Sequence, residues 1–296
     1  MKIVNASVEL IPQSAGLEGV YKQIELAGRT AYKSEDKITE DSAKKFVTIL
    51  INRKHGAALE HGTVYLKYRC KWDGDALTGF YERNPYSNVV VKCVKDDYEN
   101  GWAMSLFYIT TNYRVIVENG RLEDLKCTSP PYKSHIKRYT CKFVLSRGIA
   151  NEFVRHRVFS FLQESTRYCN YSKNKFNGVT FVSSIKCPLN VGEYSVNDNH
   201  ELIGDGLIYD LEKEKPTPSQ SMTLAYYNAE VLYLSLLDQG VKPQIARDVL
   251  PLGLKTELIM TGTVEQWKEF LNLRCACDAH PDAKYLADKV KDILNL

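Results

Sequence analysis

The chain contains 296 residues, of which 44% are hydrophobic, and its formal net charge is +3. This length and hydrophobic content suffice for a packed core in one large domain or two small ones. No stretch approaches the roughly 20 apolar residues of a membrane-spanning helix, and the opening segment MKIVNASVEL has the pattern of a strand rather than of a signal peptide. We therefore expect a folded cytoplasmic protein with no membrane partner. The net charge is too small to indicate nucleic-acid binding by itself.

The cysteines do not follow the close spacing of a small disulfide-bonded protein, so we expect free thiols. One pair has the spacing Cys-x-Cys, but no second pair or histidine lies at ligand spacing, and we expect no metal site. The eight cysteines are Cys70, Cys93, Cys127, Cys141, Cys169, Cys187 and the Cys-x-Cys pair, Cys275 and Cys277.

The first predicted helix runs from about Thr39 to Lys54. Its hydrophobic residues recur at helical spacing, and Gly56 is placed to end it. The apolar stripe consists of Ala43, Phe46, Val47 and Leu50.

A strand is predicted from Thr63 to Tyr68, and the turn before it carries three chemically active side chains. His55 lies at the C-terminal end of the preceding helix, while Glu60 and His61 lie in the turn itself. These three residues should therefore group near the turn. Two interpretations of His61 stay open, a buried structural histidine or a direct ligand.

The segment at about residues 71–134, from Lys71 to Ser134, is predicted to be an insertion. Turn-forming pairs such as Asp-Gly and Asn-Pro separate short apolar runs. We predict small strands within it, such as Val89 to Val94, and a helix around Trp102 to Val117. A strand from His135 to Leu145 then returns to the core.

A second helix is predicted from Ser146 to Val158. Its apolar residues lie on one helical face, which places Arg155 and Arg157 on the flanks, away from the core. The apolar face consists of Ile149, Ala150, Phe153 and Val154. We expect His135 and His200, outside this helix, at the surface.

A loop-rich stretch from Lys173 to Pro218 precedes a long helix from Ser219 to Gln239. A short helix opening at Pro243 then carries Arg247. The next segment, Leu254 to Gly262, has the pattern of a strand.

A capping box at Thr263 and Gln266 predicts the start of one more helix. Arg274 falls at helical spacing from the residues of this helix that should be buried, Val264, Trp267 and Leu271. An arginine on such a face needs a partner, because an unpaired buried charge is costly. That partner is either a carboxylate in a structural ion pair or a ligand.

The run RHRVFSFLQESTRY is the most specific motif of the chain. Arg155, His156 and Arg157 are followed, after seven residues, by Ser165 and then by Arg167. Guanidinium groups bind phosphate oxygens bidentately, and hydroxyl groups complete such a site. The motif therefore indicates a phosphorylated ligand.

This spacing, Arg-His-Arg, seven residues, then Ser-x-Arg-Tyr, resembles the signature of the flavin-dependent thymidylate synthases. The segment KHGAALEH and the run from Pro243 to Arg274 also resemble that family. The resemblance implies an α/β (α+β) fold, with a central, mostly antiparallel sheet and flanking helices. It implies a single domain over residues 1–296, interrupted by the insertion at about 71–134. It does not account for the insertion.

The resemblance further implies reductive methylation of dUMP to dTMP, with FAD as cofactor and NADPH and methylenetetrahydrofolate as co-substrates. It implies a homotetramer with shared active sites, in which Arg247 can serve a neighbouring subunit. No catalytic cysteine is implied. The residues carried over for FAD are His55, Glu60, Arg155, His156 and Arg157. Those for dUMP are Glu152, Gln163, Ser165, Arg167, Arg247 and Arg274, of which Arg274 and Ser165 are the catalytic candidates.

The chain departs from the family pattern at several positions. Leu162 and Gln163 stand where an Asn and a Glu are common, and Glu164 is displaced by one position. Thr263 and Glu265 stand where some members have an Asn and an Arg on the flavin. Glu152 replaces a common Gln and could pair with Arg155 or His156 at helical spacing.

Two other functions are compatible with these residues. One is a flavin nucleotide hydroxymethylase of the same fold, which the departures at Gln163, Thr263 and Glu265 leave open. The other is a nucleic-acid-binding protein that uses Arg155, Arg157, Arg167 and the nearby tyrosines as a backbone clamp. The small net charge argues against the clamp, and we expect no nucleic-acid partner.

Overall fold

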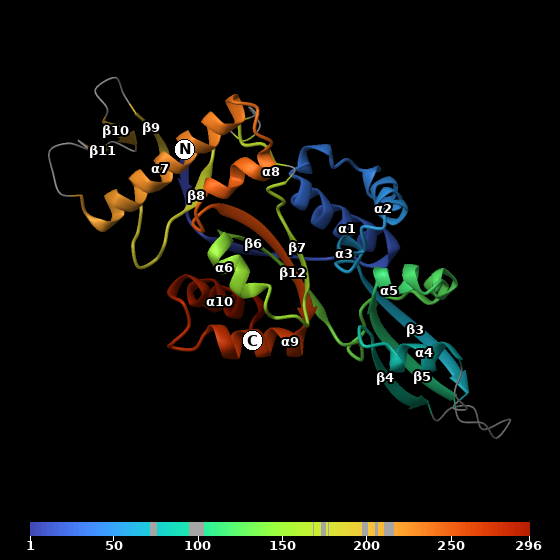
Figure 1. The fold of residues 1–296 in the computed structure, drawn as a ribbon. Coiled ribbons are helices and arrows are strands. Elements are labelled where there is room, and N and C mark those ends of the chain that lie inside the picture. The colour runs from blue at the N-terminus through green and yellow to red at the C-terminus, as the bar shows by residue number, and fades with distance from the viewer. Residues whose placement is uncertain are drawn as a thin grey trace.

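The described part of the chain is a mixed α/β fold with three sheets, each accompanied by helices (Figure 1). Within these residues, no helix combines the length and the apolar character needed to cross a membrane. The computed structural model describes residues 1–71, 76–94, 104–167, 169–172, 176, 178–196, 201–204, 207–209 and 216–296.

The central sheet is antiparallel and has the strand order β2-β6-β12-β7. β6 and β12 pair along their whole length, from Arg138 opposite Thr263 to Ser146 opposite Lys255. The strands are β2 (Ser7–Ile11), β6 (Arg138–Ser146), β7 (Ser160–Gln163) and β12 (Lys255–Thr263).

The two faces of this sheet differ in chemistry because side chains alternate along a strand. Cys141, Phe143 and Leu145 of β6 are fully buried against three helices. Their neighbours Thr140 and Lys142 point to the opposite, polar face, where Lys142 pairs with a glutamate of β12. The covering helices are α6 (Arg147–Phe153), α9 (Val264–Arg274) and α10 (Pro281–Leu294).

A second sheet, of order β11-β10-β9-β1-β8, packs against the long helix α7 (Pro218–Asp238). Ile3 and Phe181 contribute its buried apolar residues, and Phe181 stacks on Tyr226 of α7. The strands are β1 (Lys2–Val4), β8 (Thr180–Val182), β9 (Gly192–Val196), β10 (Leu202–Gly204) and β11 (Leu207–Tyr209), followed after α7 by α8 (Pro243–Ala246) and η4 (Arg247–Val249).

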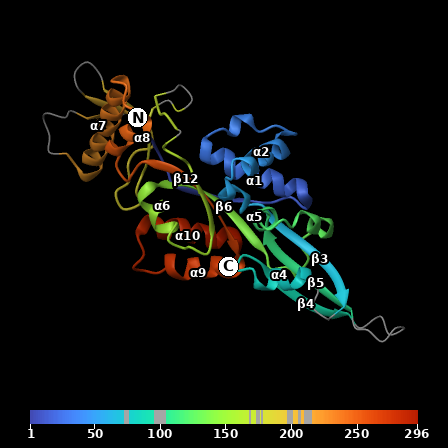
Figure 2. The same cartoon turned by 45° about the vertical axis from the view of Figure 1, so that its right-hand side comes forward.

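The third sheet, β3-β5-β4, is built by the insertion together with the strand that precedes it. Figure 2 shows that it extends away from the central sheet, as it does in Figure 1. Its elements are β3 (Thr63–Lys71), α4 (Ala76–Arg83), β4 (Asn88–Val94), β5 (Met104–Asn112), α5 (Tyr113–Glu118) and η3 (Leu122–Cys127).

The helix predicted from Trp102 to Val117 is wrong over most of its length. Residues 104–112 form the central strand of the third sheet, and only the residues from Tyr113 onward are helical. β5 pairs with β3 on one side and β4 on the other, so its backbone hydrogen bonds are satisfied by the sheet. The run SLFYITT, rich in aromatic and β-branched residues, suits such a strand. Trp102 lies outside the described residues.

Helices near the N-terminus share a core with the insertion. Val20, Ile24 and Leu50 pack in one cluster with Ile109 of β5 and Ile116 of α5. The insertion is therefore packed into the body of the protein. These helices are α1 (Gly16–Tyr32), η1 (Glu35–Lys37), α2 (Ser42–Asn52) and α3 (Gly56–Leu59).

Several predicted boundaries shift. The first predicted helix is confirmed as the shorter α2, and Gly56 begins α3 instead of ending α2, because the chain turns at Lys54 with φ 57°. The helix predicted from Ser146 to Val158 ends at Phe153. The structure confirms three predicted strands with small changes in their ends, those at 63–68, 135–145 and 254–262. It likewise confirms the helices predicted at 219–239, from 243 and from 264.

The expectation that His135 lies at the surface is wrong. Its side chain is buried, with Nε2 paired with the Leu66 carbonyl at 3.0 Å and Nδ1 accepting from the Tyr132 backbone N–H at 3.0 Å. His200 and Tyr168 lie outside the described residues. Cys70 and Cys93 have no described side chain, and the other six cysteines are free thiols, as expected.

The shared core of the insertion can be tested with one substitution. Ile109→Ala removes a side chain with 0% exposure, and we expect it to lower the free energy of unfolding by about 2–5 kcal/mol. Ile49→Ala on α2 is the matched control, because Ile49 is 45% exposed and its loss should change the stability by less than about 0.5 kcal/mol. Urea denaturation measures both, and similar small losses would show that the insertion is only loosely attached.

Candidate active site

Arg274 is the centre of a polar cluster where α9 ends. A capping box between Thr263 and Gln266 fixes the start of α9, and Arg274 is its last residue. The Arg274 guanidinium donates from Nη1 to Glu152 Oε2 at 2.6 Å, from Nη2 to the Glu152 carbonyl at 2.8 Å, and from Nε to His156 Nε2 at 3.0 Å. The predicted need for a partner is thus met by Glu152 of α6 and by the motif histidine.

His156 is held in one neutral form by this contact. Because Nε2 accepts from Arg274, the ring proton lies on Nδ1. Burial and the Arg274 charge lower the pKa of His156 to about 4. The ring is therefore neutral near pH 7 and offers its Nδ1–H as a hydrogen-bond donor.

Glu152 does not pair with Arg155, as helical spacing had suggested, but with Arg274. The ion pair is 2.6 Å long, and the two side chains are 15% exposed for Arg274 and 35% exposed for Glu152. A ligand that reached this guanidinium would have to share it with a carboxylate.

A second cluster gathers Ser165, Arg167 and Arg247. The Ser165 backbone N–H donates to the Ala31 carbonyl at the end of α1, and its Oγ accepts from the Arg167 N–H at 3.4 Å. Arg247, at the start of η4, donates from Nη1 to Thr166 Oγ1 at 2.9 Å. The segment that carries Ser165 and Arg167 is thus anchored to the end of α1 and contacts Arg247 from a distant part of the chain. No described hydrogen bond joins this cluster to that of Arg274.

Gln163 and Glu164 point to different surroundings because they are neighbours on an extended segment. Gln163 Nε2 donates to Thr256 Oγ1 at 3.3 Å. Glu164 is 2% exposed and accepts from Lys255 Nζ at 3.0 Å and from the Tyr171 hydroxyl at 3.3 Å. Glu164 therefore has an internal structural role, and Tyr171 is a buried residue beside it.

The polar face of the central sheet carries a buried ionic cluster that was not predicted from the sequence. Glu257 of β12 forms ion pairs with Lys33, with Lys142 at 3.1 Å and with Lys255 at 2.6 Å. Burial raises the pKa of Glu257, but Lys255 and Lys33 outweigh it and bring the pKa to about 2. The sequence did contain one indication of this ion pair. Lys255 and Glu257 are two residues apart on a predicted strand, and such residues lie on the same face of a sheet.

The residues predicted for FAD fall in two places. Arg155 and Arg157 are exposed and form no ion pair with any described residue, so their guanidinium groups are accessible to a phosphate. His156, between them, contacts Arg274. His55 and Glu60 contact the N-terminal helices and the insertion: His55 Nδ1 lies 2.8 Å from the Tyr32 hydroxyl, and Glu60 accepts from Arg114 at 2.6 Å.

Arg138, which the sequence did not single out, links these two places. It donates to the Glu60 carbonyl and also to Ser160 Oγ, each at 3.3 Å. Ser160 lies in the motif run that begins at Arg155. The segment KHGAALEH and the motif therefore adjoin each other around Arg138.

His61 is a buried histidine with 0% exposure. Its Nδ1 lies 2.8 Å from Thr261 Oγ1, which in turn lies 2.8 Å from Thr140 Oγ1. Burial, and to a lesser degree the charge of Arg138, lowers the pKa of His61 to about 3. These contacts favour the structural interpretation of this residue.

The comparison that decides the family is a match over the region that contains both clusters. The family model of the thymidylate synthase complementing protein matches residues 135–295, more than half of the chain. The chain belongs to this family. The match contains β6, the motif, α9 and α10, and the insertion lies before it.

Curated flavin-dependent thymidylate synthases match the chain at low identity. A probable flavin-dependent thymidylate synthase of Paramecium bursaria Chlorella virus 1 is 26% identical over 52% of this chain and 64% of its own length. The flavin-dependent thymidylate synthase of Synechocystis is 27% identical over 46% of this chain and 56% of its own length. These two matches span only about half to two thirds of the relatives.

Another relative and one solved structure match most of the chain. The flavin-dependent thymidylate synthase of Aquifex aeolicus is 20% identical over 94% of this chain and 95% of its own length. A crystal structure of the UMP/dUMP methylase PolB from Streptomyces cacaoi covers 99% of this chain and 92% of that one, with 18% identity and a TM-score of 0.43.

The buried His61 predicts a pH dependence of stability. Its pKa is about 3 in the folded protein, against about 6.5 in the unfolded chain, so below pH 6.5 the unfolded chain gains a proton that the folded protein does not. Between pH 6.5 and 5 we expect His61 to remove about 1–2 kcal/mol of stability, with a smaller loss from the half-buried His156.

His61→Asn should flatten this pH dependence, measured by urea denaturation at pH 6.5 and at pH 5. His280→Asn is the matched control, because His280 is exposed and asparagine can replace it as the cap of α10. An unchanged slope in His61→Asn would contradict the assignment of the pH dependence to His61.

Proposed function

We propose that this protein converts dUMP to dTMP by reductive methylation, with methylenetetrahydrofolate as carbon donor and FAD carrying hydride from NADPH. The observation that supports the proposal most directly is the cluster at Arg274. There an arginine at the end of α9 contacts the histidine of the Arg-His-Arg motif. Membership of the family, and the names of the curated relatives, support the reaction type.

The cluster of Ser165, Arg167 and Arg247 is the proposed site of the dUMP phosphate. Two guanidinium groups and a hydroxyl group match the oxygens of a phosphate dianion. Thr166 orients Arg247 by accepting from its Nη1 at 2.9 Å. Gln163, which lies in the same segment and is anchored by Thr256, is the proposed contact to the nucleoside.

Arg274 is the proposed catalytic residue that polarises the uracil ring. Uracil is a poor nucleophile, so the reaction needs stabilisation of negative charge on its carbonyl side. The contacts with the Glu152 carbonyl and with His156 fix the guanidinium plane, which reduces the reorganisation needed when substrate binds. The Glu152 carboxylate competes for the same charge, and substrate binding is expected to displace it from Nη1.

The residues of the motif fit a flavin dinucleotide. Arg155 and Arg157 present exposed guanidinium groups for its phosphates, and neutral His156 offers an Nδ1–H donor. His55 and Glu60 are the proposed contacts on the side of the KHGAALEH segment. When bound, FAD supplies the hydride that reduces the transferred carbon.

We also propose a homotetramer with shared active sites, formed by single-domain subunits that span residues 1–296 and carry the insertion at 71–134. The packing of β5 with α1 and α2 in one core supports the single domain. Arg247 contacts Thr166, whereas Arg274 contacts Glu152 and His156, which is consistent with one subunit supplying Arg247 and another supplying Arg274 to the same nucleotide.

The first experiment is an absorbance spectrum of the purified protein, followed by tritium release from dUMP labelled on the uracil ring, with folate and NADPH supplied. We expect a flavin spectrum, tritium release and dTMP. Flavin with a hydroxymethylated product would favour the nucleotide hydroxymethylase. If the protein binds neither flavin nor nucleotide, the proposal is wrong.

Arg274→Ala should lower kcat about 100- to 1000-fold, because a positioned donor to a developing oxyanion is lost. Arg274→Lys should rescue little, since lysine cannot reproduce the planar fork. Lys268→Ala is the control on the same helix, where the exposed Lys268 pairs with the exposed Glu265 at 2.9 Å. A rate for Arg274→Ala within threefold of the control would exclude the polarising role.

Shared active sites predict complementation between two inactive variants. Coexpressed Arg247→Ala and Arg274→Ala chains should regain about one quarter of the wild-type rate if subunits mix at random, because a site that takes one residue from each chain is intact. Each variant purified alone provides the baseline. No recovery from a demonstrated mixed oligomer would place both arginines in the same subunit's site.

A further inference from the structure

Lys33, the residue that ends α1, contacts the buried ionic cluster of the central sheet. Its ammonium group donates to Glu257 Oε1 of β12. The same oxygen accepts from Lys255 at 2.6 Å, and Lys255 also donates to Glu164 Oε2 at 3.0 Å. A continuous network of charges therefore joins the end of α1 to the residue that precedes Ser165.

The backbone of the same segment is bound to the same two elements. The Ser165 N–H donates to the Ala31 carbonyl of α1 at 3.0 Å, and the Glu164 N–H donates to the Glu257 carbonyl of β12 at 2.8 Å. Two consecutive residues are thus held by α1 and by β12. The proposed phosphate-binding segment must shift if the end of α1 moves relative to β12.

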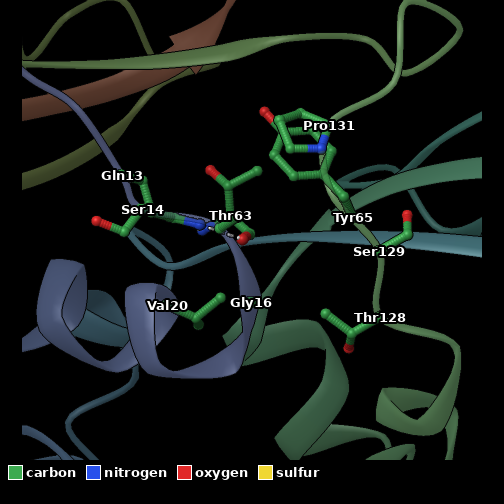
Figure 3. A pocket seen from close by; sticks show the side chains of 10 residues that line it. Gln13, Ser14, Gly16, Val20, Thr63, Tyr65, Thr128, Ser129 and Pro131 are labelled. Atoms are coloured by element: carbon green, nitrogen blue, oxygen red, sulfur yellow. Dashed lines mark hydrogen bonds between the residues drawn. The ribbon is translucent and has the colours of Figure 1, made fainter.

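The opposite end of α1 is held by separate contacts. Gln13, which precedes this helix, donates to the Thr63 carbonyl at 2.7 Å and accepts from the Thr63 N–H at 2.8 Å, and Figure 3 shows these two residues near the start of α1. Val20 of α1 is buried in the core that the N-terminal helices share with the insertion. α1 is therefore a fixed support, and the contacts of its last turn determine where the segment lies.

The backbone of Lys33 has a conformation that favours glycine. Its φ is 49° and its ψ is 54°, in the left-handed region where glycine commonly ends a helix. The presence of a lysine here is explained by its ammonium group rather than by its backbone. Burial lowers the pKa of this group, but the contacts with Glu257 outweigh burial and raise it, so the charge is retained.

We propose that Lys33 is a positioning residue for nucleotide binding, which acts through Glu257 to hold the Ser165–Arg167 segment where its donors meet the phosphate. This inference rests on the proposed function, because it takes that segment as part of the site of the dUMP phosphate. The role requires no contact between Lys33 and the nucleotide.

Lys33→Met removes the charge and keeps a side chain of similar length. We expect the KM for dUMP in the tritium-release assay to rise about tenfold, with kcat within about threefold of the wild type. A substitution that only destabilised the fold would lower the apparent kcat, because less enzyme is folded, and would leave KM unchanged. Calorimetric titration with dUMP measures the same loss of affinity without turnover.

Lys142→Met is the matched control. Lys142 also pairs with Glu257, at 3.1 Å, and its side chain is 18% exposed against 16% for Lys33. It lies on β6, and the strand order β2-β6-β12-β7 places it on the side of β12 away from β7 and the segment that follows β7. We expect this variant to bind dUMP within about twofold of the wild type. Lys33→Arg should restore most of the affinity, because a guanidinium can also pair with the Glu257 carboxylate.

Lys33→Gly provides a second variant if Lys33→Met proves unstable, because glycine suits the left-handed backbone. It should weaken dUMP binding as Lys33→Met does. The inference is overturned if the Lys33 variants bind dUMP within about twofold of the wild type, or if Lys142→Met weakens binding equally, and the proposed function then still stands. If the wild-type protein binds no dUMP, the proposed function is wrong and the role of Lys33 is wrong with it.

Discussion

The pairing of β6 with β12 is the constraint on which the rest of the structure depends. Nine consecutive residue pairs fix the register, so every side chain of both strands is assigned to one of two faces. One face is apolar and covered by α6, α9 and α10. The other is polar and also buried, and its charges must compensate one another, as Glu257 does with three lysines.

The position of the candidate site depends on the segment that follows each of these strands. β6 continues into α6, which supplies Glu152 and then the motif histidine, while β12 continues into α9, which ends at Arg274. β7 pairs with β12 and leads directly to Ser165. The fixed register thereby places residues from sequence positions more than a hundred apart within hydrogen-bond distance, as in the contact of Arg274 with Glu152.

The sequence predicted most of the central strands and the need of Arg274 for a partner, because those features are local or lie in a distinctive motif. It could not identify Glu152 as that partner, since the choice depends on how α6 and α9 cross. It mistook β5 for a helix because the run SLFYITT has no clear period, and the neighbouring strands decide its conformation. The helices α1 and α10 were not predicted, and Arg138 looked like an ordinary strand residue until its surroundings were known.

The register of the central sheet also orders the folding of the chain. Every β6–β12 pair joins residues more than a hundred positions apart, whereas the β3–β5 pairs lie within fifty positions of each other. Closing a long loop costs more chain entropy than closing a short one, and sheets of distant strands form slowly. The core of α1, α2 and β5 can therefore assemble while a ribosome is still making the C-terminal half, and the cluster at Arg274 forms only after β12 and α9 have left the exit tunnel.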